Sequence, residues 1–527
     1  MGKGSRNRQT TMSEQVNASR YTAPKKSVGK TIRNVLIGLL VAAFVGVGIF
    51  GLLSTTGVLM DKLTAFEIGD QKISALDYKI YYKTAEINLI NQYGSTLQTY
   101  YGVDLTKPLE TQAYGDGTWG DYLHSSTKSK LTETYTLYLE ALANGYELAG
   151  DEDPIYQGKM AEYRATAALY NMDLDKYINA VYGSAADLSD LQRIAKIEAT
   201  ADKYYNDYTE SLKISDTDIQ NYYSANKLTF DKADYRSFDF PYETVKYTAP
   251  AEGKTVEEGK PKSEEEATTM TQANIAAAQA KADEFLSKIT DEASFSSLAK
   301  EYANANDADK YADDSATLTT NADLSSTNSK VVTWCADDSR NAGDKGTVDS
   351  GSSITVVYFI NRYLPEVSTA TTRHILIKAT AASENATAEE KAKAETALTD
   401  AKAKIEEINK EWESGEKTED RFAQLAMKYS DDAGSVQKGG LYKDFSEGSM
   451  VAEFNDWVFD SSRKSGDTGI VKTTYGYHLI YFVGNGDYAW KVSARTSLIN
   501  SAYSEYYKGI STKYATADHN YAQSLAY

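Results

Sequence analysis

An internal repeat constrains the fold of this chain more than any other feature of its sequence. Tryptophan, Asp, Ser-Arg, Gly-Asp, Gly and Val coincide in the gap-free alignment of Trp334–Val348 with Trp457–Val471. Two further matches lie upstream in the same order, Phe295–Tyr302 with Phe422–Tyr429 and 235–240 with 372–377. Three matches in the same order argue against chance, because colinear self-similarity is the signature of a repeated structural unit.

The repeat predicts two copies of one α+β domain, residues 234–366 and 367–486. Each copy is expected to contain a strand, helices, a Gly-rich connection, a short helix and two closing strands, which form an antiparallel sheet flanked by helices. Before the copies, residues 59–233 show apolar and tyrosine residues at helical spacing, with a strand–turn–strand at 65–73 and a helix cap at Ser74. After them, residues 487–527 are predicted to be helical.

The amino-terminal part of the chain has the pattern of a membrane anchor. Residues 34–60 carry no charge, and about 20 apolar residues span the ~30 Å hydrocarbon core. Basic residues dominate the preceding segment, so the positive-inside rule predicts a cytoplasmic tail at 1–33, a transmembrane helix at 34–58 and an extracellular remainder. A cleaved secretory signal is the alternative, although the apolar run exceeds the usual 7–15 residues. The expected location is the cell membrane, in single-pass topology.

Charge and cysteine content exclude several functions. The chain has 75 acidic and 56 basic residues and a net charge of −19, which argues against nucleic-acid binding, because phosphate neutralisation needs clustered Lys and Arg. A single cysteine, Cys335, excludes a disulfide framework and multi-cysteine metal sites. We expect no metal or other cofactor.

The second copy resembles the parvulin family of peptidyl-prolyl isomerases. The resemblance is carried, in the family's order and spacing, by Arg373–Ile377, Phe422–Asp432, Gly434-Ser435, Gly439–Leu441, Phe445 to Phe454 and Val471–His478. It implies that His374, Asp432, Thr473 and His478 are catalytic-site residues and that Leu441, Met450 and Phe454 form the proline pocket. The chain departs from the family at Gly440-Leu441-Tyr442, where many members read Asp-Leu-Gly, and this departure bears on substrate preference.

The residue chemistry agrees with such an activity. Rotation about an amide bond meets a barrier of about 18–20 kcal/mol, and a site needs only to stabilise the twisted amide over the planar one. An apolar pocket can hold the proline ring, and neighbouring polar groups can stabilise the twisted carbonyl without a nucleophile. Three alternatives stay open: His374 as a core histidine, a His/His/Asp metal site, and Leu441, Met450 and Phe454 as ordinary core residues.

The first copy lacks these side chains. Ser237, Ala305 and Thr355 occupy the places of His374, Asp432 and His478. We therefore predict that this copy is not an isomerase and serves as a spacer or client-binding surface.

A helical region before parvulin copies, followed by a helical tail, resembles the PrsA and SurA group of extracytoplasmic foldases. The resemblance implies a chaperone module built from the amino-terminal helices and the returning tail, with 492–510 as the returning helix. The predicted function is a membrane-anchored isomerase and chaperone whose partners are unfolded or newly translocated chains containing Xaa-Pro bonds. The alternatives are a non-catalytic holdase or assembly scaffold with a vestigial site, and an acidic surface that binds basic partners. Oligomeric state is left open.

Overall fold

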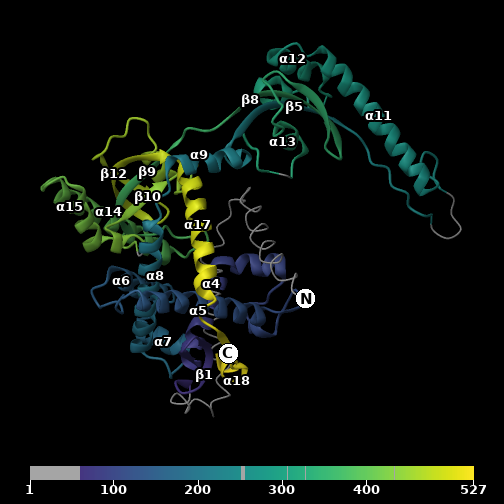
Figure 1. Ribbon diagram of the computed structural model, residues 1–527. Coiled ribbons are helices and arrows are strands. Elements are labelled where there is room, and N and C mark those ends of the chain that lie inside the picture. The colour runs from purple at the N-terminus through teal and green to yellow at the C-terminus, as the bar shows by residue number, and fades with distance from the viewer. Residues whose placement is uncertain (1–59, 251–255, 306, 327, 433, 527) are drawn as a thin grey trace. The chain divides into compact units, whose positions relative to one another are not determined.

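The computed structural model describes residues 60–250, 256–305, 307–326, 328–432 and 434–526, which fall into two compact units (Figure 1). Among the described residues, the first unit contains those up to Lys213, Ala370–Gly486 and those from Ser501 onward, and the second contains Ile214–Thr369 and Asp487–Asn500. The predicted transmembrane helix at 34–58 lies outside the described residues. Within the described part of the chain, no helix is both long and apolar enough to cross a membrane.

Five long or medium helices form most of a helical module in the first unit. They are α4 (Ala75–Tyr101), α5 (Trp119–Ala143), α6 (Pro154–Leu169), α7 (Leu174–Tyr182) and α8 (Leu188–Ser211). Each begins after a Ser, Thr or Asp whose side chain accepts a hydrogen bond from the backbone of the first turn, which satisfies an otherwise unpaired donor. The predicted cap at Ser74 is among them, with Asp77 N donating to its hydroxyl over 3.0 Å.

A three-stranded sheet joins both ends of the described chain in this module. Its order is β13-β1-β2, formed by β1 (Thr64–Ile68), β2 (Gln71–Ser74) and β13 (Thr516–Asp518). The following α18 (Asn520–Gln523) and the 3₁₀ turn Ser524–Ala526 place Ala522 and Ala526 in the same hydrophobic core as α4 and α5. The sequence predicted a helical tail, and β13 differs from that prediction. Its residues are exposed, and they form a strand because they pair with β1.

The remaining elements of the module and its connections are short. They are the 3₁₀ turn Leu109–Thr111, β3 (Ala113–Tyr114) and β4 (Gly117–Thr118). In the second unit, α9 (Asp216–Ala225) and α10 (Lys227–Phe230) pack with the first residues of α17 (Ala489–Ser511), where Trp490 and Phe230 are buried together. The helix predicted at 492–510 corresponds to α17.

Each repeat copy folds as a four-stranded antiparallel sheet with helices. In the first copy the order is β6-β5-β8-β7, from β5 (Lys232–Pro241), β6 (Leu318–Asp323), β7 (Lys345–Asp349) and β8 (Ser353–Tyr363). In the second it is β10-β9-β12-β11, from β9 (Ser368–Lys378), β10 (Leu441–Phe445), β11 (Thr468–Thr473) and β12 (Gly476–Tyr488). The predicted α+β class with antiparallel sheets is confirmed.

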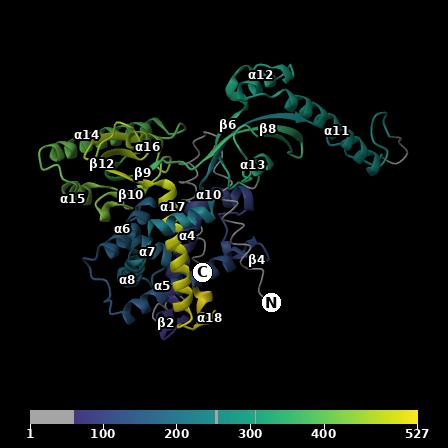
Figure 2. The ribbon, with the colours of Figure 1, turned by 45° about the horizontal axis from the view of Figure 1, so that its top comes forward.

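Helices cover both faces of each sheet. In the first copy, α11 (Glu264–Lys288) and α12 (Glu292–Tyr302) lie on one face and α13 (Lys330–Cys335) on the other, as Figure 2 shows. The corresponding helices of the second copy are α14 (Ala388–Glu413), α15 (Glu419–Tyr429) and α16 (Ala452–Val458). Short 3₁₀ turns at Lys310–Ala312, Asp314–Thr317 and Val436–Lys438 complete the copies.

The repeated Trp and Arg residues form the same contact twice. The Arg340 guanidinium lies 3.8 Å from the centre of the Trp334 ring, and Arg463 lies 3.9 Å from that of Trp457. Each Arg Nε also donates to the carbonyl of its Trp, at 3.2 and 3.0 Å. A cation held over an indole face is favourable by about 0.5–2 kcal/mol, so the repeat keeps residues that fix the turn after the short helix.

Candidate functional site

Two buried histidines lie at the centre of the second copy. His374 on β9 and His478 on β12 are 2 and 5% exposed, and their rings stack with centroids 5.3 Å apart at an interplanar angle of 17°. Side chains alternate along a strand, so Ile375 packs into the core under α14 and α15, while His374 faces α16. The sheet therefore brings together two residues that are 104 positions apart in the sequence.

A continuous hydrogen-bond chain runs through the two rings. Thr473 Oγ1 lies 2.9 Å from His478 Nε2, the two Nδ1 atoms lie 3.1 Å apart, and His374 Nε2 lies 2.9 Å from Asp432 Oδ2. One assignment satisfies every ring nitrogen: Thr473 donates to His478 Nε2, His478 Nδ1–H donates to His374 Nδ1, and His374 Nε2–H donates to Asp432. In this assignment both rings are neutral, and the chain ends on a carboxylate.

The electrostatics fit this assignment. Burial, with the neighbouring His374 next in importance, lowers the pKa of His478 from 6.5 to about 3. Burial would raise the pKa of Asp432, but hydrogen bonds from His374 and Ser435 outweigh it, so the pKa lies well below its usual 3.8. Asp432 is thus ionised and His478 neutral at physiological pH.

Three donors meet on one oxygen of Asp432. Besides His374, the Ser435 hydroxyl and the Tyr442 hydroxyl donate to Oδ2, the latter over 2.9 Å. Ser435 is 1% exposed and also lies 3.0 Å from His374 Nε2. The sequence singled out neither Ser435 nor Tyr442 as a site residue, although both stand in or beside the motifs that carry the family resemblance.

The predicted pocket residue Leu441 does not lie with the residues around His374 and Asp432. Leu441 pairs across the sheet with Arg373, whose side chain reaches Glu419 on α15, on the face opposite His374. Its neighbour Tyr442 pairs with Thr372 and lies with its ring 4.9 Å from that of His374. The structure therefore puts Tyr442 where the sequence placed Leu441, because adjacent strand residues point to opposite faces.

Met450 and Phe454 supply the apolar wall of the site. Phe454, on α16, is buried with its ring 5.7 Å from His374 and 5.5 Å from His478, edge to face in both cases. Met450 is partly buried and packs on the same cluster. Six of the seven residues predicted from the sequence thus gather at one place: His374, Asp432, Thr473, His478, Met450 and Phe454.

A glycine lets the edge strand approach the histidine. His374 N donates to Gly440 O over 2.8 Å, and Gly440 has a φ of +70°. A Cβ at this position would overlap the carbonyl oxygen of His374. Only glycine fits both the left-handed conformation and the close contact.

The first copy has the same sheet without this chain. Thr355 pairs with Val348 as His478 pairs with Val471, which places Thr355 at the His478 position. Its hydroxyl donates to Asp239 and lies 2.8 Å from Ser350 Oγ, and Ala305 is exposed. Cys335 is the buried last residue of α13, and burial raises its pKa to about 12, so it is a neutral thiol.

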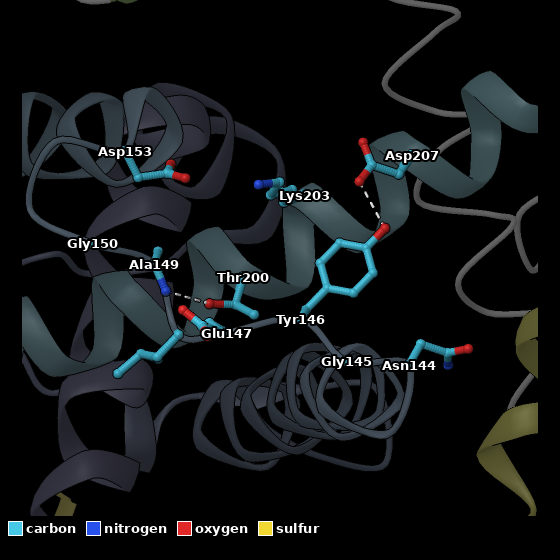
Figure 3. A pocket seen from close by; sticks show the side chains of 11 residues that line it. Asn144, Gly145, Tyr146, Glu147, Ala149, Gly150, Asp153, Thr200, Lys203 and Asp207 are labelled. Atoms are coloured by element: carbon cyan, nitrogen blue, oxygen red, sulfur yellow. Dashed lines mark hydrogen bonds between the residues drawn. The ribbon is translucent and has the colours of Figure 1, made fainter.

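A further feature of the structure lies apart from the histidines. A pocket of about 450 Å³ in the helical module is lined by the turn after α5 and by α8, with Tyr146 donating to Asp207 over 2.7 Å and the Ala149 amide to Thr200 over 3.0 Å (Figure 3). Among the described residues, no group of three or more His, Cys, Asp and Glu side chains is arranged to hold a metal ion.

Comparison with known proteins defines the class of the second copy. The model of the PPIC-type PPIase domain matches residues 358–485, so this region is a parvulin-type peptidyl-prolyl isomerase domain. The resemblance found in the sequence is confirmed.

The particular relatives are PrsA foldases. The chain is 42% identical to foldase protein PrsA 1 of Listeria innocua over 77 residues, which cover 15% of this chain and 25% of the relative. It is 35% identical to foldase protein PrsA 3 of Bacillus cereus over 122 residues, 23% of this chain and 32% of the relative. The chain therefore spans about a quarter to a third of the length of these curated relatives.

Solved PrsA structures are also similar. The crystal structure of PrsA from Bacillus subtilis is 15% identical, with a TM-score of 0.29, over 77% of this chain and 92% of that one. PrsA from Bacillus anthracis is 26% identical, with a TM-score of 0.18, over 26% of this chain and 52% of that one.

Proposed function

We propose that this protein is a membrane-anchored, extracytoplasmic peptidyl-prolyl isomerase and chaperone that assists the folding of secreted proteins. Its clients are unfolded or newly translocated chains containing Xaa-Pro bonds. One observation carries the proposal: a hydrogen-bond chain of buried Thr473, His478 and His374 ends on half-buried Asp432, beside the apolar side chains of Met450 and Phe454.

The residues divide the chemistry between binding and electrostatics. Met450 and Phe454 hold the pyrrolidine ring, which leaves the preceding carbonyl beside the polar chain. An X–Pro bond isomerises unaided in tens to hundreds of seconds, and the site accelerates this by binding the twisted amide more tightly than the planar one. Because the chain through His374 and His478 is fully paired, it forms a rigid, preorganised wall, and neither ring needs to exchange a proton during turnover.

The sequence supports the membrane anchor. The uncharged run at 34–60 follows a strongly basic tail, which favours a cytoplasmic amino terminus and an external isomerase domain. Anchoring concentrates the site near chains that emerge from the membrane, without any new contact.

Isomerisation of a panel of Xaa-Pro peptides tests the proposal. Wild-type residues 61–527 are compared with His374→Ala and with His519→Ala, a control outside the site whose imidazole lies 3.3 Å from Glu67. We expect acceleration that is lost in His374→Ala and kept in the control. If the folded wild type accelerates no peptide, the isomerase function is refuted, and suppression of client aggregation becomes the test of a non-catalytic holdase.

A further inference from the structure

We propose that Tyr442 is a positioning residue of the isomerase site, which holds the Asp432 carboxylate against His374 through its hydroxyl. This inference rests on the proposed isomerase function. It assigns to the edge strand β10 a polar role, whereas the sequence predicted only an apolar pocket residue there.

The first observation is geometric. Tyr442 Oη donates to the same Asp432 oxygen that accepts from His374, over 2.9 Å in both cases, so the tyrosine and the histidine hold the carboxylate from two sides. The tyrosine ring also lies against the imidazole, at an interplanar angle of 31° and with centroids 4.9 Å apart. A hydrogen bond to a charged acceptor is roughly twice as strong as one between neutral groups, so this contact restrains the carboxylate effectively.

The second observation comes from the other copy of the domain. Thr319 pairs with Tyr235 on β5 as Tyr442 pairs with Thr372 on β9, so Thr319 occupies the Tyr442 position. That copy has Ala305 in place of Asp432. Within one chain, the tyrosine is therefore present where the carboxylate is present and absent where it is absent.

The protonation state agrees with donation. Burial, followed by the charge of Asp432, raises the pKa of Tyr442 above 10. The hydroxyl keeps its proton at any physiological pH and donates it to the carboxylate, while Ser435 supplies the third donor.

The same domain offers a matched control. Tyr429, on α15, donates to Glu411 Oε2 over 2.8 Å, which is a second tyrosine–carboxylate hydrogen bond. It lies on the opposite side of the sheet from the histidines, where α14 and α15 pack. Tyr429→Phe removes the same chemical contact without touching the site.

The first test is a double-mutant cycle in the full chain. We expect Tyr442→Phe to lower kcat/KM for Xaa-Pro peptides about tenfold, and Tyr429→Phe to change it less than about twofold. In an Asp432→Ala background, Tyr442→Phe should cost less than about twofold, because its acceptor is gone. Equal losses in both backgrounds would overturn the proposal, since a purely structural role does not depend on Asp432. The melting temperature of each variant shows that it is folded.

The second test does not depend on activity. In the full chain labelled with ¹⁵N-histidine, Tyr442→Phe should shift the imidazole signals of His374 and His478 and leave those of His124 and His519 unchanged, whereas Tyr429→Phe shifts none. Unchanged His374 signals in Tyr442→Phe would overturn the positioning role. If wild type proves inactive and the shifts still appear, the isomerase function fails while the positioning contact stands.

Discussion

The neutrality of His478 leads to a specific dependence of stability on pH. Its pKa is lowered from 6.5 to about 3 in the folded protein, so between these values the unfolded chain binds a proton that the folded chain does not. Stability must therefore fall as the pH decreases from 7. At pH 5, about 1.5 units below the unfolded value, the loss is about 2 kcal/mol at about 1.4 kcal/mol per unit.

Hydrogen exchange measures this loss within one domain. After correction for the intrinsic rates, slow amides of β9 and β12 should exchange about 30-fold faster at pH 5 than at pH 7 through this contribution. His478→Gln removes the titrating ring. The difference in pH response between wild type and this variant therefore isolates the contribution of His478. Strand β8 of the first copy is an internal control, because Thr355 stands at the equivalent position. An equal pH response in wild type and His478→Gln would refute the reasoning.

Three further predictions concern the scaffold. Gly440→Ala should destabilise the second copy by at least about 1–2 kcal/mol, because it places a side chain at positive φ against the His374 carbonyl. Faster hydrogen exchange in β9 with unchanged exchange in β8 would show this destabilisation. Unchanged exchange in both strands would contradict it. A purified 234–366 fragment should not accelerate prolyl isomerisation, because its sheet has no histidine pair, and acceleration would count against the prediction. Deletion of 516–527 should increase exchange in β1 and α4 and leave β5 unaffected, since β1 loses one of its two partner strands; equal protection in the deleted chain would argue against a stabilising tail.

Local pattern was enough to predict much of this structure. Helix caps such as Ser74 act within a single turn, so their residues are visible in sequence. The family resemblance was enough to name His374 and His478 as site residues, and the structure shows that they lie on neighbouring strands.

Contacts between distant segments determine the features that the sequence did not predict. The exchange of Leu441 for Tyr442 is a one-residue difference on an edge strand, and such a difference inverts which side chain faces the site. The register is set by the close approach of Gly440 to His374, which is a contact between distant segments. Strand β13 has no apolar alternation and becomes a strand only by pairing with β1.

The β1–β13 pairing also dictates the order in which the protein can be completed during synthesis. Strand β13 follows β1 by roughly 450 residues, which at 5–20 residues per second takes roughly 20 to 90 s to translate. During this interval β1 can pair with β2 on one side only, and all elements of both repeat copies are made before β13. The isomerase domain can therefore acquire its fold before the sheet of the helical module is complete, and the nascent module exposes the unpaired edge of β1 until β13 is made.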